Sequence, residues 1–473
     1  MNMSLLRHEW FLLRKDRMLL FAAALLLGLM ALGLYNGWCF TQDLRAHQQA
    51  LLTQEAWRRD QLAAQAEALR QGQGTAPPAW KSPTMPVPVG NFLVQPEALL
   101  PPGPLSTFTV GQMDLLPSSY QVSLQGRLTD FARETLEHPA HLATGTLDVS
   151  FVLLYLLPLF ALAFSFDLVS REREDGTLRL VLVQATGLRG WALRRLAVRA
   201  AVLLGLCVLA GLAGHVLTGG GGGLPRLLGW LALVVGYGAF WFCLALAVNA
   251  RALSSATNAL VLVGVWLLLV VVVPAAAQLG VSALYPVPSR VALVGATRDA
   301  SLDAQRRGSE VLSAYFEDHP ELAPKGTRTE GYWPTALAVQ DEAARATAPV
   351  VAAFQSQLDA QQSALELLRF ASPALAFQQA LQDVAGTGGA RHAHFLRQVD
   401  RFHASWREAL LPRVFAGDTL GAADHARLPR FAYVEQPGAD VVPRVALGFL
   451  ALAWPTLLAL GLGLLWLGRP RLS

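Results

Sequence analysis

The chain has 473 residues, a mean hydropathy of +0.37 and 15% charged residues, whereas soluble domains carry about a quarter. This composition excludes an ordinary soluble protein, because the apolar excess lies in long uncharged runs typical of a polytopic membrane protein. The pI near 9.1 does not indicate a nucleic-acid partner, since the positive charges lie beside the apolar runs and not on one soluble face.

The amino-terminal residues 1–17 predict an amphipathic helix lying on the membrane surface. Apolar and basic side chains fall on opposite sides of a helical wheel, although Glu9 lies in the apolar arc and Phe11 in the basic one. The alternative is a plain extension of the first span, with cations that reach up to the headgroups.

Six apolar runs are long enough, or nearly so, for a helix of about twenty residues across a bilayer. The predicted spans are residues 18–40, 149–169, 200–217, 227–249, 256–277 and 445–468. Lys and Arg gather before the first span, after the last, and in the loop 170–199, which places these segments and both termini in the cytoplasm.

Two large inserts, residues 41–148 and 278–444, then lie outside the membrane. The expected fold class is an all-α polytopic membrane protein of six transmembrane helices with a mainly helical extracytoplasmic domain formed by the two inserts. In the first insert, good helix formers continue the first span through Asp43–Gln71, and a proline-rich piece follows at Pro77–Pro104. Loops and short elements follow from Val110, and Ser123–His138 predicts a helix leading to the second span.

The second insert opens with an irregular, proline-marked stretch from Leu284 to Ala300. Helical propensity and periodicity then predict a series of helices. Their expected ranges are Ser301–Glu317, Pro334–Phe370 with a break at Pro349, Ala374–Ala385 and Ala390–Leu411.

No residues in the sequence predict catalysis or metal binding. His392 and His394 are two residues apart and do not share a helix face, no H-E-x-x-H occurs, and solvated histidines are the expected alternative to a metal site. The glycine tract 219–223 lacks the Lys and Ser/Thr of a P-loop and predicts a turn. No cysteine pair suggests a disulfide or a zinc site. Three polar residues within the spans could mark a pathway or form interhelical hydrogen bonds: Asn36, His215 and Asn258.

A dense cluster of charges, SREREDGTLRL, opens the longest cytoplasmic loop at Ser170. Asp175 can cap a short helix whose apolar stripe is formed by Leu178, Val181, Leu182 and Ala185, and Thr186-Gly187 can end it. Such a stripe needs either lipid headgroups or a protein pocket. The adjacent charges favour a protein pocket of complementary charge.

The run R-E-R-E-D-G-T-L, between two apolar spans and ahead of L-R-G-W, resembles the first cytoplasmic loop of permeases of the type-2 exporter family of ABC transporters. YPVPSR (285–290), DHPEL (318–322), ASPALAFQQAL (371–381) and F-x-x-Q-V-x-x-F (395–402) resemble a branch of that family with two large inserts, known largely as a domain of unknown function. The resemblance covers nearly the whole chain. The family pattern continues with a Pro or Ser turn where this chain has Thr186-Gly187, so it does not define the far boundary of the coupling element.

The resemblance implies a permease subunit of the bacterial inner membrane that couples to a dimer of ATP-binding subunits and pairs with a second permease copy or paralogue. Glu172, Glu174, Gly176, Thr177 and Leu178 occupy the family's coupling motif. This chain has no Walker A motif, so it holds no cofactor itself, and ATP and Mg would be bound by the partner ATPase. The motif, its neighbouring charges and the apolar stripe together give the expected ATPase-coupling residues: Arg171, Glu172, Arg173, Glu174, Gly176, Thr177, Leu178, Val181 and Leu182.

Two further hypotheses stay open beside export. Because the inserts make up over half of the chain, the complex could transmit force to a periplasmic or outer-membrane partner without moving a substrate. The chain could also be a membrane-anchored receptor or scaffold with no ATPase. The transported substrate and the direction of transport cannot be read from the residues.

Overall fold

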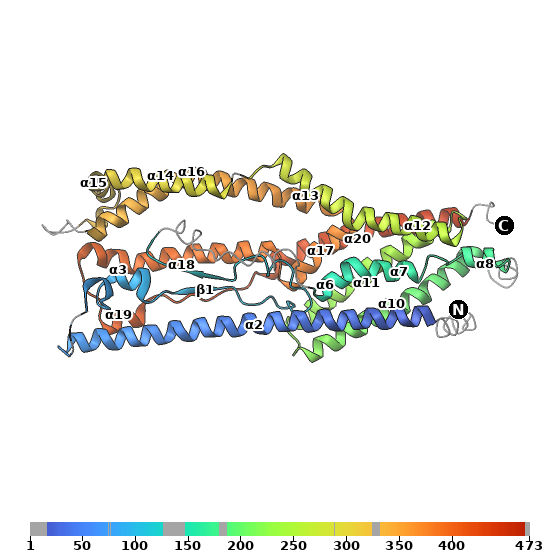
Figure 1. The fold of residues 1–473 in the computed structure, drawn as a ribbon, viewed down its shortest axis with the longest axis horizontal. Helices are drawn as coiled ribbons and strands as arrows, with labels where there is room; N and C mark the ends of the chain where they lie inside the picture. Colours follow the sequence, from blue (N-terminus) through green and yellow to red (C-terminus); the bar gives the residue numbers. More distant parts are fainter. Residues whose placement is uncertain are drawn as a thin grey trace.

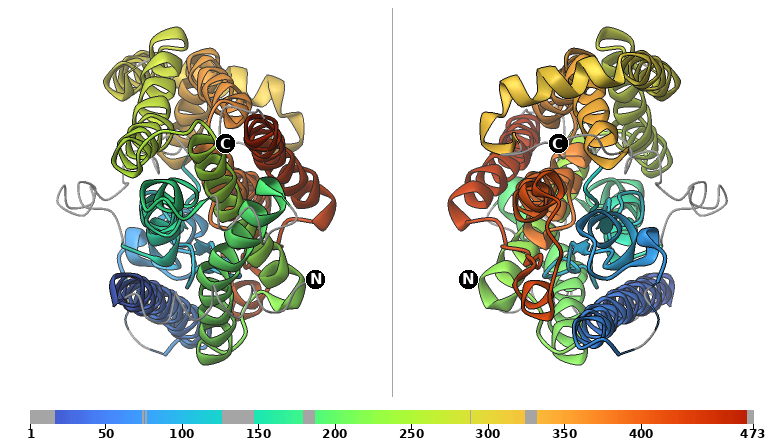
Figure 2. Two further views of the ribbon diagram at one scale, coloured as in Figure 1. Left: turned by 90° about the vertical axis from the view of Figure 1, so that its right-hand side faces the viewer. Right: turned by 90° about the vertical axis from the view of Figure 1, so that its left-hand side faces the viewer.

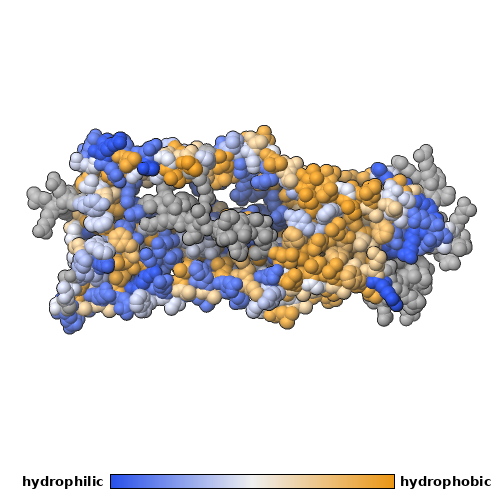
Figure 3. Space-filling model, viewed as in Figure 1, coloured by the Kyte–Doolittle hydropathy of each residue, from blue (hydrophilic) through white to orange (hydrophobic). Residues whose placement is uncertain are grey.

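The computed structural model describes residues 17–73, 75, 77–125, 147–178, 187–287, 289–323 and 332–468. Within these ranges the chain is mostly helical and the molecule is elongated (Figure 1). One half carries a belt of hydrophobic residues and the other is mainly hydrophilic (Figure 3). We call them the apolar half and the hydrophilic half, and we call the tip of the apolar half, where α2 begins and α20 ends, the charged end.

Five helices of the described residues are long and apolar enough to cross a membrane. A sixth apolar helix, Val149–Ala163, reaches only about 22 Å at 1.5 Å per residue, against roughly 30 Å of hydrocarbon. Apolar helices of this length indicate a membrane-embedded protein, whereas full spanning length is reached by five of the six predicted spans. The five are α2 (Arg17–Arg70), α10 (Leu188–Leu217), α11 (Gly223–Asn249), the continuous α12–α13 (Ser255–Leu284) and α20 (Gly438–Leu467).

The second predicted span, 149–169, is helical only as far as Ala163. It consists of α6 (Val149–Phe151), the π-helical turn η3 (Val152–Leu156) and α7 (Leu157–Ala163). Residues 164–169 form turns whose carbonyls accept hydrogen bonds from side chains of other helices, Phe164 from Arg199 (2.7 Å) and Ser165 from Asn249 (3.0 Å). Because these carbonyls have tertiary donors, the helix ends without leaving them unpaired.

The predicted loop 170–199 is shorter than the sequence suggested. Helix α10 begins at Leu188, because residues 188–199 are rich in the helix formers Leu, Ala and Arg and two of these arginines are buried against the second span. The connection is therefore 170–187, and its residues 179–186, with the stripe positions Val181, Leu182 and Ala185, lie outside the described residues. The amphipathic helix predicted for residues 1–17 lies almost entirely outside them as well.

Helix α2 is the longest element and runs through both halves. Its 54 residues correspond to roughly 81 Å, which confirms the predicted continuation of the first span to Gln71 within one residue. Gly33 and Gly37 let α2 lie close to the backbone of Asp148 and Thr107, since a Cβ atom at Gly37 would lie 2.2 Å from the Thr107 carbonyl oxygen. Helix α2 is continuous from the charged end into the hydrophilic half (Figure 1).

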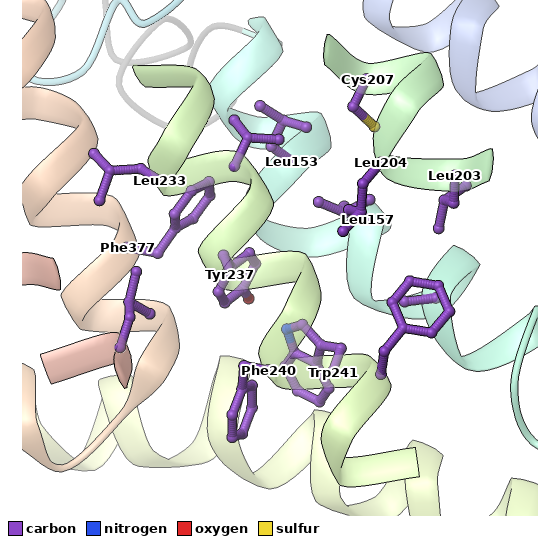
Figure 4. Packing of buried hydrophobic residues seen from close by; sticks show 14 of the residues in the cluster. Leu153, Leu157, Leu203, Leu204, Cys207, Leu233, Tyr237, Phe240, Trp241 and Phe377 are labelled. Carbon is purple, nitrogen blue, oxygen red and sulfur yellow. The ribbon is translucent and has the colours of Figure 1, made fainter. Parts of the chain in front are cut away.

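Helix α11 lies at the centre of the apolar half. Of its most apolar 18-residue window 72% is buried, compared with 11% for α12–α13. Figure 4 shows its Tyr237 and Trp241 among leucines of α7 and α10 and Phe377 of α17 (Pro373–Ala385). Burying such aromatic side chains supplies much of the free energy that packs the helices together.

Helix α17 was expected in the extracytoplasmic insert, yet it packs against both α11 and α20. The Phe377 ring stacks on the Tyr237 ring at 4.2 Å, and Gly448 of α20 leaves space where a Cβ would lie 2.5 Å from the Ala380 Cβ. The segment S-P-A-L-A-F-Q-Q-A-L has small and apolar residues on one face, which allows this close insertion. Part of the second insert therefore returns among the apolar helices.

The hydrophilic half contains a small antiparallel sheet, in which Ala98 pairs with Tyr120. These two strands depart from an all-α fold because neighbouring prolines at 96, 101 and 117 disfavour a helix. The bounds of these two strands and of the remaining helical turns and helices follow. They are η1 (Ala79–Lys81), α3 (Pro86–Pro88), η2 (Val89–Leu93), β1 (Glu97–Leu99), β2 (Ser119–Gln121), α14 (Arg290–Arg306), α15 (Gly308–Asp318), η5 (Pro320–Leu322), α16 (Tyr332–Leu367), η6 (Leu368–Phe370), α18 (Gly389–Ala416) and α19 (Ala422–Arg427).

Three sequence predictions for the second insert are wrong. The single helix expected at Ser301–Glu317 is divided at Arg307 between α14 and α15. The stretch expected to be irregular is helical from Arg290, where Ser289 caps α14 by accepting from the Ala292 N–H. Helix α16 continues through Pro349, whose missing N–H is tolerated at an exposed position where water can bind the freed carbonyl. The predicted approach helix Ser123–His138 lies mostly outside the described residues.

The hydrophilic half has its own core, separate from that of the apolar half. Phe395, Phe402 and Trp406 of α18 pack with the strands and with α3, and Tyr315 of α15 stacks on Phe415 at 5.3 Å. Helices α14 and α16 form one long edge of the molecule and α2 the opposite edge (Figure 2).

Candidate functional site

The predicted coupling segment begins as the short helix α8 (Ser170–Glu174) at the charged end (Figure 1). Ser170 is buried, whereas Arg171, Asp175 and Gly176 are exposed. Gly176 has a φ of +72°, so the chain turns there in a conformation that favours glycine. Leu178 is buried in the apolar core, which fixes the far side of this turn.

Glu172 binds within the chain rather than pointing into solvent. Its Oε1 lies 3.2 Å from Nη1 of Arg195, which is buried on α10, and its backbone and carboxylate both accept from the Thr177 hydroxyl. Arg195 also donates to the Leu168 carbonyl oxygen (3.1 Å) and its guanidinium lies over the Trp191 ring. From the sequence we expected a partner protein to carry the charge complementary to this cluster. For Glu172, Arg195 of α10 carries it within the chain.

Glu174 binds the first turn of α12. Its two carboxylate oxygens accept from the Ser255 backbone N–H and hydroxyl, both at 2.7 Å, and these hydrogen bonds lower the pKa of Glu174. Arg173 donates to the Leu253 carbonyl just before that helix, and the Ser170 and Ser255 hydroxyls are 2.8 Å apart. A carboxylate at a helix N-terminus is also favoured by the helix dipole.

Asp167, in the turn before α8, forms the most buried ion pair of this region. Its Oδ1 lies 2.7 Å from Nη1 of Arg199, which is buried on α10, while Arg171 approaches its other oxygen at 3.6 Å from the exposed side. A buried pair of this kind is sensitive to loss of either partner, because the remaining charge would be left unpaired in an apolar environment.

Asn249, the last residue of α11, connects three segments. Its amide donates to the Ser165 carbonyl oxygen, its side-chain oxygen accepts from the Val169 N–H (3.2 Å), and that oxygen also lies 3.3 Å from the Asn258 amide of α12. Asn258 in turn donates to Phe166. Segment 164–174 is therefore bonded to α10, α11 and α12 at once. We call this set the charged junction: Asp167, Glu172, Glu174, Arg195, Arg199, Asn249, Ser255 and Asn258.

Sequence analysis found three of the eight residues of this junction. It identified Glu172, Glu174 and Asn258, but it missed Arg195 and Arg199, which we had placed in the loop. The available signal was their i, i+4 spacing, which puts both on one face of a continuous helix. A second signal was Asp167, a lone acidic residue at the end of an apolar run.

Most of the other polar residues considered in the sequence make structural contacts, whereas Nδ1 of His215 is buried and has no hydrogen-bond partner among the described residues. Asn36 donates to the Leu147 carbonyl oxygen (3.0 Å), so it and Asn258 form interhelical hydrogen bonds. His392, His394 and His403 each bond a backbone carbonyl oxygen, and His392 is buried where we had expected it to be solvated. Among the described residues, no group of three or more His, Cys, Asp or Glu side chains could hold a metal ion.

Comparison with known proteins bears on the hydrophilic half and on α17, which packs in the apolar half. A family model described as a domain of unknown function (DUF3526) matches residues 290–434, from α14 to beyond α19. No curated protein and no solved structure matches the chain. The matched region contains none of the charged junction.

Proposed function

We propose that this chain is the membrane-spanning permease subunit of an ABC transporter complex, with N- and C-termini in the cytoplasm of a bacterial cell. Separate ATP-binding subunits would bind ATP and Mg and act on segment 170–178. The observation that carries the proposal is the charged junction, which fixes this segment to three long apolar helices while leaving part of it exposed.

Under this proposal, one side of the segment contacts the partner and the other side attaches the segment to the long helices. Arg171, Asp175 and Gly176 face outward and are free to meet a partner surface. Glu172 and Glu174 hold the segment to α10 and α12. A force applied to the exposed side would be transmitted to α10 and α12 through short, charge-assisted hydrogen bonds rather than through a flexible loop.

A second permease copy, or a paralogue, is part of this proposal. The α12–α13 helix is the least buried of the five spanning-length helices. Its exposed side chains include Leu260, Leu267 and Leu279. Lipid would cover some of this surface, and a second copy would cover the rest.

One observation favours conformational work over export as the output. Helix α2 continues unbroken for 54 residues from the charged end into the hydrophilic half, so a tilt at one end moves the other. The hydrophilic half would then act on a periplasmic or outer-membrane partner. Structures of the complex in several nucleotide states would discriminate: a sealed interface between the copies in every state favours conformational work, and a ligand-sized passage favours export.

The test reverses charges on the exposed side of the segment only. The variant Arg171→Glu/Asp175→Lys should lose co-purification of the ATPase and ATP hydrolysis by the complex, because both changes face the proposed partner. The matched control is Arg298→Glu/Asp299→Lys on α14, which makes the same changes at exposed positions in the hydrophilic half. Undiminished ATPase binding by the first variant would refute the docking role, and a wild-type chain that never binds an ATPase would favour a receptor or scaffold.

A further inference from the structure

Two of the apolar helices contain the same irregularity. The second predicted span has the π-helical turn Val152–Leu156, and α12–α13 has the π-helical turn η4, Leu268–Val272. In each, a proline follows two residues after the turn, Pro158 and Pro274. Proline has no N–H and its ring clashes with the carbonyl four residues earlier, and a wider π turn is one way for a helix to relieve that clash.

Each π turn has a carbonyl, shortly before its proline, that accepts a hydrogen bond from the side chain of another segment. The Leu154 carbonyl oxygen, four residues before Pro158, accepts from the Tyr237 hydroxyl (2.9 Å). The Leu269 carbonyl oxygen, five residues before Pro274, accepts from the Ser372 hydroxyl (2.6 Å). In an apolar environment such donors are needed, because no water replaces them.

The two π turns are also bonded to each other. Trp266 lies on α12 just before η4, and its indole N–H donates to the Tyr155 carbonyl oxygen of η3 (3.2 Å). Both turns contact α17 as well, since Ser372 caps this helix and Phe377 stacks on the Tyr237 ring that bonds η3. Helix α17 thus rests on both irregular turns and leads directly to α18 in the hydrophilic half.

We propose that η3 and η4 form one coupled joint, at which the second span and the α12–α13 helix bend together and carry α17 with them. Prolines and π turns are the usual places where helices kink. The side-chain bonds of Tyr237, Trp266 and Ser372 hold the bent form. Under the proposed function, the joint would relay movement of the charged junction to the hydrophilic half; the existence of the joint itself does not rest on that function.

The experiment measures bending in the isolated chain, reconstituted in lipid nanodiscs without an ATPase. Spin labels at Leu217 and Leu284, both exposed, report the distance between the ends of α10 and α13 beyond the joint. The reference pair is Ala197 on α10 and Leu260 on α12, both on the side of the joint that faces the charged end. The three free cysteines are first replaced by serine.

Pro274→Ala or Ser372→Ala should move the Leu217–Leu284 distance by about 5 Å, the sweep of a ten-residue arm through a kink of roughly 20°. Pro158→Ala should shift the same distance, although it lies in the other helix, because Trp266 and α17 link the two turns. Pro455→Ala, in α20 and outside the joint, should change neither distance.

If Pro158→Ala leaves the Leu217–Leu284 distance unchanged, the two turns are independent and the coupled joint is refuted. An equal shift from Pro455→Ala would also refute it, since the response would then be a general effect of removing proline. Failure of an ATPase to bind would overturn the proposed function without affecting either outcome.

Discussion

The charged end and the hydrophilic half both contain buried arginines that pair with a carboxylate and donate to backbone carbonyl oxygens, but these arginines are arranged differently. At the charged end, Arg195 and Arg199 lie one turn apart on α10, and both bind segment 164–174. They do so through the carboxylates of Glu172 and Asp167 and through the Leu168 and Phe164 carbonyl oxygens. In the hydrophilic half, Arg59 of α2 donates to the Leu428 and Pro429 carbonyl oxygens, and Arg391 of α18 donates to that of Pro101. Arg59 and Arg391 also pair with a glutamate, but they lie on different helices and hold different loops.

The difference lies in how many arginines hold each stretch of chain. Irregular chain in the hydrophilic half has carbonyls without backbone donors, and long arginine side chains supply those donors. The charged end has to hold one short segment against three helices, and ion pairs do so from several directions. We therefore expect loss of an arginine to loosen a local loop in the hydrophilic half and to detach the whole of segment 164–174 at the charged end.

The largest expected effect is at Arg199. Arg199→Met leaves the half-buried Asp167 with only its longer contact to the exposed Arg171. It should lower the free energy of unfolding by about 3 kcal/mol, the lower end of the cost of breaking a buried pair. Arg171→Met is the matched control, because Arg171 approaches the same carboxylate from solvent at 3.6 Å and should cost under about 1 kcal/mol. Denaturation in detergent measures both, and hydrogen exchange should show residues 164–174 opening in the first variant only. Equal effects of the two variants would contradict the different roles assigned to the arginines.

A smaller effect is expected at Arg59. Its guanidinium lies 2.8 Å from Glu55 and binds two carbonyl oxygens after α19, so Arg59→Met should cost about 2–3 kcal/mol. Hydrogen exchange should rise around residues 420–430 and stay unchanged at the charged end. Arg70→Met, which removes an exposed pair with Glu67 on the same helix, should leave both regions unchanged. Exchange that rises equally in both halves would show that they do not unfold as separate units.

The smallest effect concerns the pH dependence of the hydrophilic half. His425 is buried, its Nε2–H donates to the Pro83 carbonyl oxygen (2.8 Å), and its Nδ1 has no hydrogen-bond partner among the described residues. Burial lowers the pKa of His425, although Asp424 beside it raises that pKa, and Arg59 lowers it further. The unfolded chain therefore binds this proton more readily than the folded one.

The stability contributed by neutral His425 is complete above the unfolded pKa of about 6.5 and is lost as the pH falls below it. The slope should reach at most about 1.4 kcal/mol per pH unit. His425→Gln should flatten the curve of melting temperature between pH 7.5 and 5.5. His394→Gln, which removes another histidine bonded to a backbone carbonyl, is the control and should leave the slope unchanged. A slope unaffected by His425→Gln would exclude this histidine as its source.

Much of the fold was predictable from local patterns. Apolar runs gave the approximate positions of the long helices, and helix propensity extended the first of them to Gln71, where the structure ends α2 at Arg70. Predictions were wrong where the surroundings of a residue in the folded chain outweighed its local sequence preference. Pro349 did not break α16 because that position is exposed, and the second span ended early because its last carbonyls are bonded by Arg199 and Asn249.

The sequence by itself determined that the chain has long apolar helices, a dense charge cluster between two of them, and no P-loop of its own. These follow from composition and spacing within short windows. Only the tertiary structure decided that Glu172 and Glu174 bind α10 and α12, that α17 packs against both α11 and α20, and that a hydrogen bond from Trp266 links the two proline-marked turns. The partners in each case are distant in the chain, and which side chains meet depends on how whole helices pack, which no short stretch of sequence specifies.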